Sequence, residues 1–173
     1  EKMSKSKGNM VPFRNLINKF GSDLVRINIA CSNEGMDDAI WYEDNIKGYS
    51  TRLEFLHEVC KDFKKAGSKK TRNAERFLLS TLENNIQLAT EFYENLKFRS
   101  AVNIALFDNL NNLKWYLKRT DGIKNANEKV LEDFLTSVIK LIAPLSPHLS
   151  EELWSILGNK DFISTEKWPE KTD

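Results

Sequence analysis

Residues 74–96, AERFLLSTLENNIQLATEFYENL, decide the fold class, because their apolar side chains return at every third or fourth position. That spacing places them on one face of an α-helix, whereas a half-buried strand would alternate at every second residue. The stretch therefore predicts a long amphipathic helix with one buried face. Its apolar positions are Ala74, Leu78, Leu82, Ile86, Ala89, Phe92, Tyr93 and Leu96.

The same period recurs on both sides of this stretch. Apolar stripes of helical spacing cover residues 44–66 and 102–117, and residues 128–143 are apolar on more than one face, which predicts a central helix. The break before residues 102–117 is only a few residues long, so the two helices that it joins should be antiparallel neighbours. No segment keeps a strand period for more than four residues. The sequence therefore predicts an all-α fold, an antiparallel helix bundle.

Three shorter helices are predicted near the ends of the chain from their capping residues. Proline in the first turn, a hydroxyl at the N-cap and glycine after the last turn mark helix ends. We also expect His148 to pair with Glu152, one turn further along its helix. The predicted spans are 13–20 between Pro12 and Gly21, 23–31 capped by Ser22, and 147–157 capped by Ser146 and closed by Gly158.

Composition excludes several classes of protein. The 173 residues carry 26 Lys and Arg against 25 Asp and Glu, which excludes a histone-like polycation, and 40% are hydrophobic, which argues against disorder. No apolar run is long enough for a membrane span and no signal peptide is visible, so we expect no membrane partner and a reducing compartment. The two cysteines and two histidines have no zinc-finger spacing, so we assign no metal ligand. Cys31, Cys60, Trp115 and Trp154 fall on apolar helical positions and are expected to pack in the core.

The first residues carry the chemistry. Lys2-Met3-Ser4-Lys5-Ser6, followed by Lys7-Gly8-Asn9, sets three ammonium groups and two hydroxyls on a short segment with a glycine. Such a segment can fold over a polyphosphate, because lysines supply mobile positive charges and hydroxyls supply donors. It is no Walker loop, since the GxxxxGK[ST] spacing is absent. The alternative interpretation is a solvated basic tail.

The order of residues favours the first interpretation. KMSKS followed by GN resembles, letter for letter, the signature loop of class I aminoacyl-tRNA synthetases. GSDLVR at 21–26 resembles the G-A-D-x-x-R segment that follows this loop in the leucyl, isoleucyl, valyl and methionyl enzymes. EGMDDAIW at 34–41 is most similar to the archaeal and eukaryotic branch of leucyl-tRNA synthetases. APLSPHLSEELW at 143–154 is similar to a segment near the end of the family's helical anticodon-binding domain.

The resemblance implies roles for the motif residues. Lys2 and Lys5 would act in catalysis by holding the ATP phosphates during formation of the aminoacyl-adenylate, and Lys5 matches the lysine usually held most important. Lys2, Met3, Ser4, Lys5 and Ser6 together would form the ATP-binding loop. The full-length parent would use ATP and Mg²⁺ to join leucine to its tRNA. The family's HIGH motif is absent from these residues, so we expect this chain alone to be inactive and to need no cofactor.

The implied organisation has two parts. Residues 1–42 would be the KMSKS loop and connector helices, and residues 43–173 would be the anticodon-binding-type bundle. Because the chain begins at Glu1, we expect it to be a piece of a longer protein. We also expect that protein to be cytoplasmic and this piece to be a monomer. Two alternatives stay open. One is the corresponding piece of an isoleucyl-, valyl- or methionyl-tRNA synthetase, and the other is a non-catalytic helical RNA-binding module.

A cluster of cations predicts where RNA would bind. Seven cations fall within residues 61–76, between two predicted helices, and only two carboxylates oppose them. We interpret them as contacts to the tRNA backbone, with a solvated helix–helix turn as the alternative. A second cluster is more dispersed and is better explained as solvated surface: Lys97, Arg99, Lys114, Lys118 and Arg119. The predicted tRNA-binding residues are Lys61, Lys64, Lys65, Lys69, Lys70, Arg72 and Arg76.

Overall fold

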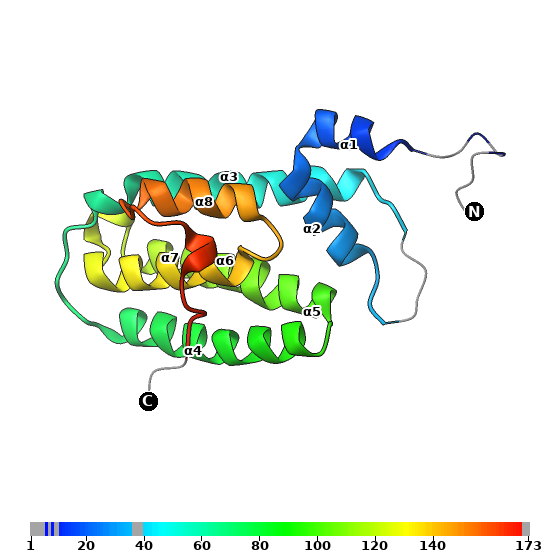
Figure 1. The fold of residues 1–173 in the computed structure, drawn as a ribbon. Coiled ribbons are helices and arrows are strands. Elements are labelled where there is room, and N and C mark those ends of the chain that lie inside the picture. The colour runs from blue at the N-terminus through cyan, green and yellow to red at the C-terminus, as the bar shows by residue number, and fades with distance from the viewer. Residues whose placement is uncertain (1–5, 7, 9–10, 36–39, 171–173) are drawn as a thin grey trace.

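We describe residues 6, 8, 11–35 and 40–170 of the chain from a computed structural model. The prediction of an all-α antiparallel bundle is confirmed: within these ranges the only β-type pairing is one isolated bridge between Ser68 and Asn127. Figure 1 shows the course of the helices. They are α1 Phe13–Phe20, α2 Ser22–Ser32, α3 Asp44–Asp62, α4 Asn73–Glu94, α5 Phe98–Val102, α6 Asn109–Arg119, α7 Glu128–Ile142 and α8 Pro147–Ile156.

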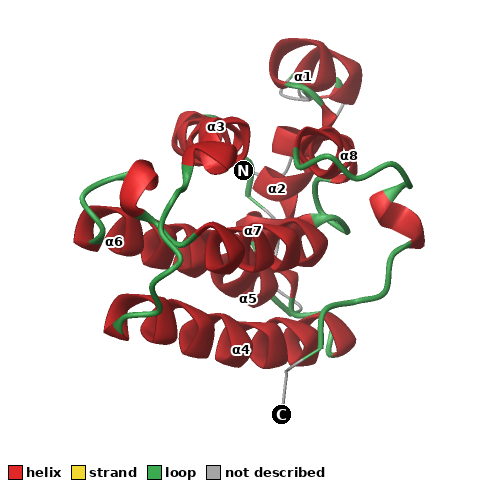
Figure 2. Ribbon diagram, turned by 90° about the vertical axis from the view of Figure 1, so that its left-hand side faces the viewer, coloured by secondary structure: helices red, strands yellow, loops and turns green. Residues whose placement is uncertain are grey.

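The bundle is built in three layers. In Figures 1 and 2, α4 forms one outer layer, α5, α6 and α7 the middle layer, and α3 and α8 the other outer layer, with α1 beyond them. The middle position of α7 agrees with its sequence, which is apolar on several faces. Its side chains with no exposed surface are Leu131, Phe134, Leu135, Val138 and Ile139, together with Leu141.

The run from Phe98 to Arg119 is continuous but changes pitch. Between α5 and α6 lies a π-helical segment, Asn103–Asp108, in which hydrogen bonds reach the fifth residue. Next to it, the buried Asn109 side chain donates to Ala105 O at 3.1 Å and accepts from Asn85 Nδ2 at 2.9 Å. Apolar spacing did not predict this segment, because a local change in pitch leaves the stripe of buried residues continuous.

Helix boundaries differ from prediction in several places. The run expected over 102–117 begins earlier, at Phe98, and ends at Arg119. The helix expected over 44–66 ends as an α-helix at Asp62, and the chain tightens into the 3₁₀ turn η2, Phe63–Lys65. Ser22 was expected to cap α2, which is wrong: Gly21 occupies the N-cap and Ser22 is the first helical residue. Gly21 does stop α1 as predicted, with φ +82° and its N–H bonded to Ile17 O at 2.8 Å.

Two predictions for the start of α8 are also wrong. The Ser146 hydroxyl makes no cap and instead donates backwards to Ile142 O at 3.2 Å. His148 does not pair with Glu152, because its Nδ1 lies 2.9 Å from Asp23 Oδ1 on α2. Both errors have one cause: α2 packs against this turn and supplies partners that lie more than a hundred residues away in sequence.

None of the helices in the described ranges combines the length and hydropathy that crossing a bilayer requires.

Candidate functional site

The proposed ATP loop falls almost wholly outside the described residues. Lys2, Met3, Ser4 and Lys5 are not among them, and neither are Lys7 and Asn9. Ser6 and Gly8 are described, and both are exposed ahead of α1. The assignment of this segment to ATP phosphates therefore stays a prediction.

The seven cations of residues 61–76 lie where the sequence placed them, between two helices. They occupy the end of α3, the turn η2, the following loop and the start of α4, at the end of the bundle opposite α1 (Figure 1). All seven are exposed. We call this region the basic tip and define it as residues 61–76.

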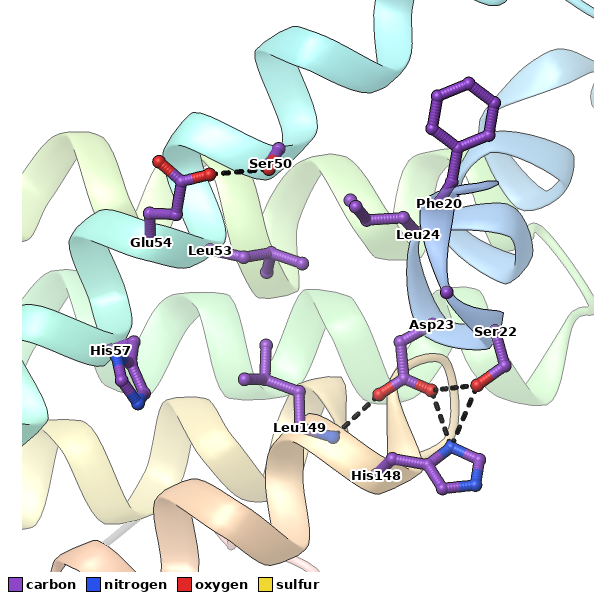
Figure 3. A pocket seen from close by; sticks show the side chains of 11 residues that line it. Phe20, Ser22, Asp23, Leu24, Ser50, Leu53, Glu54, His57, His148 and Leu149 are labelled. Carbon is purple, nitrogen blue, oxygen red and sulfur yellow. Dashed lines mark hydrogen bonds and ion pairs between the residues drawn. The ribbon is translucent and has the colours of Figure 1, made fainter. Parts of the chain in front are cut away.

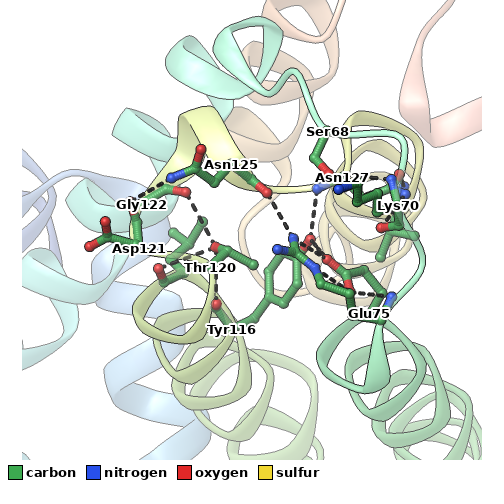
Figure 4. Close-up of polar contacts among 12 residues, drawn as sticks. Ser68, Lys70, Glu75, Tyr116, Thr120, Asp121, Gly122, Asn125 and Asn127 are labelled. Atoms are coloured by element: carbon green, nitrogen blue, oxygen red, sulfur yellow. Dashed lines mark hydrogen bonds and ion pairs between the residues drawn. The ribbon is translucent and has the colours of Figure 1, made fainter.

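The loop of the basic tip is held to the segment before α7 by backbone hydrogen bonds. Gly67 N donates to Lys124 O at 3.2 Å, Ser68 N donates to Ala126 O at 3.1 Å, and Glu128 N donates to Ser68 O at 3.2 Å. Figure 4 shows the side chains around this junction. The lysines therefore project from a fixed loop, so phosphate binding would order little backbone.

A buried carboxylate lies beneath the tip. Glu75 has 0% exposed surface and accepts from Arg72 N at 2.7 Å, from Arg72 Nη2 at 2.9 Å and from the Tyr116 hydroxyl at 3.1 Å. The Tyr116 oxygen accepts in turn from Asn127 N at 2.8 Å. Burial by itself would raise the pKa of Glu75, but the hydrogen bonds from Arg72 and Tyr116 outweigh it and lower that pKa. Glu75 is therefore ionised at neutral pH.

Arg72 thus differs from the other cations of the tip. Its guanidinium bonds Glu75 and also donates to Asn125 O at 2.9 Å, so two internal partners fix it. The side chains of Lys69, Lys70 and Arg76, by contrast, have no carboxylate within ion-pair distance among the described residues. These three, with Lys64, are the cations most available to a phosphate backbone.

Aromatic rings, several with cations over them, lie where α3 and α4 meet the run from α5 to α6, a feature that the sequence analysis missed. Trp115 was expected in the core, but it is only partly buried and packs against Phe77, which is 46% exposed, with ring centroids 4.6 Å apart. The Arg119 guanidinium lies 5.4 Å from the Trp115 ring. Tyr49 and Phe107 stack at 5.5 Å with their planes 13° apart.

Two more cations complete this surface. The Arg52 guanidinium lies 5.0 Å from the Phe107 ring, and Lys114 Nζ lies 4.9 Å from the Phe55 ring. Only the i, i+4 spacing of Trp115 and Arg119 was visible in the sequence, since the other pairs join different helices. We call this surface the aromatic face and define it as Tyr49, Arg52, Phe55, Phe77, Phe107, Lys114, Trp115 and Arg119.

The dispersed second cluster does not come together in the structure. Lys97 and Arg99 lie at the turn from α4 to α5, whereas Lys114, Lys118 and Arg119 lie on α6 (Figure 1).

The remaining tryptophan and cysteine predictions concern packing. Trp154 is buried, as predicted. Trp168, near the C-terminal end of the described residues, packs edge-on against Tyr93. Burial raises the pKa of Cys60 to about 12 and also raises that of Cys31, so both thiols are protonated at neutral pH.

A hollow of about 440 Å³ is lined by residues of α1, α2, α3 and α8 (Figure 3). Ser22, His148 and Asp23 meet at its edge, but Ser22 Oγ at 3.1 Å and Asp23 Oδ1 at 2.9 Å contact the same ring nitrogen, Nδ1. A nucleophilic triad needs the serine and the carboxylate on opposite ring nitrogens, so this trio is no hydrolytic site. Across the described ranges, no three His, Cys, Asp or Glu side chains are grouped to hold a metal ion.

Comparison with known proteins defines the class. Residues 75–173 match the family described as the anticodon-binding domain of tRNA ligase, and the chain belongs to that family. Two similar proteins indicate which kind of tRNA ligase the chain resembles. The whole chain is 34% identical to a leucine–tRNA ligase of Pyrococcus abyssi, and 98% of it is 35% identical to one of Methanocaldococcus jannaschii. The chain spans about a fifth of each, 18% of their length.

A solved structure agrees with this fold. The chain is similar to Agrobacterium radiobacter K84 LeuRS in a ternary complex with tRNA and LeuAMS, with a TM-score of 0.80 and 25% identity. The match covers 98% of this chain and 22% of that one.

Proposed function

We propose that this chain is the part of a leucine–tRNA ligase that carries the ATP-phosphate loop and the tRNA-contacting helix bundle. The observation that supports this most is the match of the entire chain, KMSKS segment included, to archaeal leucine–tRNA ligases. The two free thiols suit a reducing compartment, and we propose the cytoplasm.

In this proposal the loop stabilises developing charge. When the amino acid carboxylate attacks the α-phosphorus of ATP, negative charge spreads onto the departing pyrophosphate. Lys2 and Lys5 would hold those phosphates, with Mg²⁺ bound to ATP in the complete enzyme. Met3, Ser4 and Ser6 would shape the same loop. The HIGH half of the site is absent from these residues, so the chain alone should form no adenylate.

The tRNA surface in this proposal joins the basic tip to the aromatic face. The tip offers point charges on a fixed loop, which suits the phosphate backbone. The aromatic face offers half-exposed rings and cations, which suit the stacking of unpaired bases and contact with phosphates. Backbone contact should dominate, because leucine has six codons and the family's leucyl enzymes generally do not read the anticodon.

The test of the enzymatic part is ATP–pyrophosphate exchange by the full-length parent with leucine, isoleucine, valine and methionine in turn. We expect exchange with leucine, and a loss of at least about a hundredfold in Lys5→Ala, because one preorganised donor to the transition state is worth roughly 3–4 kcal/mol. Lys129→Ala is the control, since that ammonium bonds only carboxylates of its own helix. Exchange with another amino acid, or Lys5→Ala within threefold of wild type, contradicts the proposal.

The test of the tRNA part is a titration at two salt concentrations. Non-specific affinity, roughly 10⁻⁴–10⁻⁶ M, is expected for the chain alone. Alanine at Lys64, Lys65, Lys69 and Lys70 should weaken binding and lower the salt slope by about three, because each phosphate contact contributes roughly 0.7–0.9. If the salt dependence of tRNA binding has the same slope in the tip variant and in the control, the tip is a solvated turn that does not contact tRNA. The matched control removes the same charge elsewhere: Lys19, Lys47, Lys129 and Lys167 to alanine.

A further inference from the structure

Two segments far apart in sequence meet in space. They are the first turn of α2, which begins at Ser22, and the turn 143–146 from α7 to α8 together with the first residues of α8. Ser146 gives α8 no cap, and Pro147 at its first position has no N–H. The first N–H groups that need an acceptor are therefore those of the following residues, and α2 supplies one.

Asp23 caps α8 from another helix. Its Oδ2 accepts from Leu149 N at 2.7 Å, and its Oδ1 contacts His148 Nδ1 at 2.9 Å (Figure 3). A carboxylate at this place satisfies an orphan backbone donor and also complements the positive end of the α8 dipole. Asp23 is therefore a long-range N-cap, separated from Leu149 by 126 residues.

Arg26 donates hydrogen bonds to the other side of the same turn. Its Nε donates to Leu145 O at 3.0 Å, and its Nη2 donates to Pro144 O at 2.7 Å. Both carbonyls follow the last turn of α7, where helix carbonyls lack intrahelical partners. One turn of α2 thus places the Asp23 carboxylate against a backbone N–H group and the Arg26 guanidinium against two backbone carbonyls. Each side-chain charge meets a backbone group of opposite partial charge.

A third contact fixes the far end of α2. Glu34, just beyond α2, accepts from Ser100 N at 3.0 Å and from Ser100 Oγ at 2.8 Å, in the first turn of α5. These hydrogen bonds lower the pKa of Glu34, so the acceptor is charged at neutral pH. Both ends of α2 are therefore tied to helices of the bundle.

We infer that Asp23 and Arg26 are positioning residues that keep the segment following the KMSKS loop in register with the bundle while the amino acid is transferred to tRNA. This inference rests on the proposed function. α1 begins at Phe13, seven residues after the motif ends at Ser6, and only Gly21 separates it from α2, so α2 is the element that joins the segment after the motif to the bundle. Adenylate formation needs the loop, the HIGH half of the site, ATP and the amino acid, but no tRNA. Transfer also needs tRNA, held by the bundle, to meet that site.

The experiment compares two reactions of the full-length parent. In Asp23→Ala/Arg26→Ala we expect kcat for aminoacylation to fall about tenfold, within the 5- to 150-fold range usual for coupling between sites. KM for tRNA should stay within twofold, because neither residue belongs to the basic tip or the aromatic face. ATP–pyrophosphate exchange should also stay within twofold. Rates are divided by the amplitude of the adenylate burst, so that unfolded molecules are not counted.

Conservative variants give a second measurement. Asp23→Asn keeps an oxygen that accepts from Leu149 N and should recover most of the transfer rate, whereas Arg26→Lys lacks the rigid planar fork that spans both carbonyls and should recover little. These single variants carry the test if the double variant does not fold. The controls are Asp133→Ala and Lys129→Ala, an ion pair on the surface of α7.

The outcomes separate the two proposals. A wild-type parent without leucine-dependent exchange overturns the proposed function. An active parent in which exchange and transfer fall by the same factor, or in which neither changes, overturns the positioning role and leaves the proposed function intact.

Discussion

Replacing Glu75 by glutamine tests the buried network beneath the basic tip. Glutamine has nearly the same shape, but one of its two terminal atoms is a donor. In the native structure one Glu75 oxygen faces Arg72 N and Nε, and the other faces Arg72 Nη2 and the Tyr116 hydroxyl. Since the Tyr116 oxygen already accepts from Asn127 N, either amide orientation opposes donor to donor.

The expected cost follows from those conflicts. A buried donor left without an acceptor costs about 1–3 kcal/mol. The Arg72 side chain is 45% exposed and can be rehydrated, so its share is discounted, whereas Tyr116 and Asn127 are buried and their share is not. We expect Glu75→Gln to lower the free energy of unfolding by about 2–3 kcal/mol. For a chain of this length that corresponds to roughly 5–10 °C in Tm.

The assay is urea denaturation and thermal melting of residues 1–173, with Glu91→Gln on the exposed side of α4 as the control. The gap between wild type and variant should narrow as pH falls below the ordinary carboxyl pKa of about 4.3. The reason is that the lowered pKa of Glu75 contributes stability above that value and loses it as the pH falls through the folded-state pKa. Either of two results refutes this reasoning. One is a decrease in the free energy of unfolding of less than about 0.5 kcal/mol, and the other is a difference between wild type and Glu75→Gln that does not change with pH.

Three further results are expected. Burial raises the pKa of Tyr116 from 10.0, and of Cys60 from 9.0, to about 12, so the folded chain keeps protons that the unfolded chain releases. Tm should therefore fall as the pH rises from 9.0 toward about 12, and an unchanged dependence in Cys60→Ala would contradict this cause. Asn127→Ala removes the α7 cap on Val130 N, at 3.1 Å, and should cost about 1–2 kcal/mol in urea denaturation, against no change if the cap is incidental. Arg119→Ala should lower the salt slope of tRNA binding by about one. If the slope does not change, the aromatic face serves only in packing.

The fold was predictable because it depends on local spacing. The stripe that begins at Ala74 gave α4 to within a few residues, and the wide apolar surface of residues 128–143 gave α7 its central place. The π-helical segment Asn103–Asp108 was not predictable. It changes hydrogen bonding without interrupting the apolar stripe, and only the buried pair of Asn85 and Asn109 marks it.

The candidate sites were predictable only as far as each depends on neighbours in sequence. The charges of residues 61–76 are visible as a run, but their separation into a fixed Arg72 and available lysines depends on Glu75 being buried. The aromatic face joins three helices, so no single stretch reveals it. Likewise, the cap of α8 was assigned to Ser146 by proximity, whereas Asp23 takes that place from 126 residues away.

Local clustering explains how a chain of net charge +1 can present a basic surface, because seven cations and only two carboxylates fall within residues 61–76. Arg26 and Arg72 each donate to two fixed acceptors of the fold, and the planar guanidinium fork suits this because its N–H groups are already held in place. The carboxylates of Asp23 and Glu75 likewise accept hydrogen bonds from backbone N–H groups, and Glu75 also accepts one from the Tyr116 hydroxyl. The two carboxylates of the tip are paired, Asp62 with Lys65 and Glu75 with Arg72, so neither neutralises Lys64, Lys69 or Lys70 directly. Net charge is summed over the whole chain, and for that reason it conceals the positive charge concentrated at the tip.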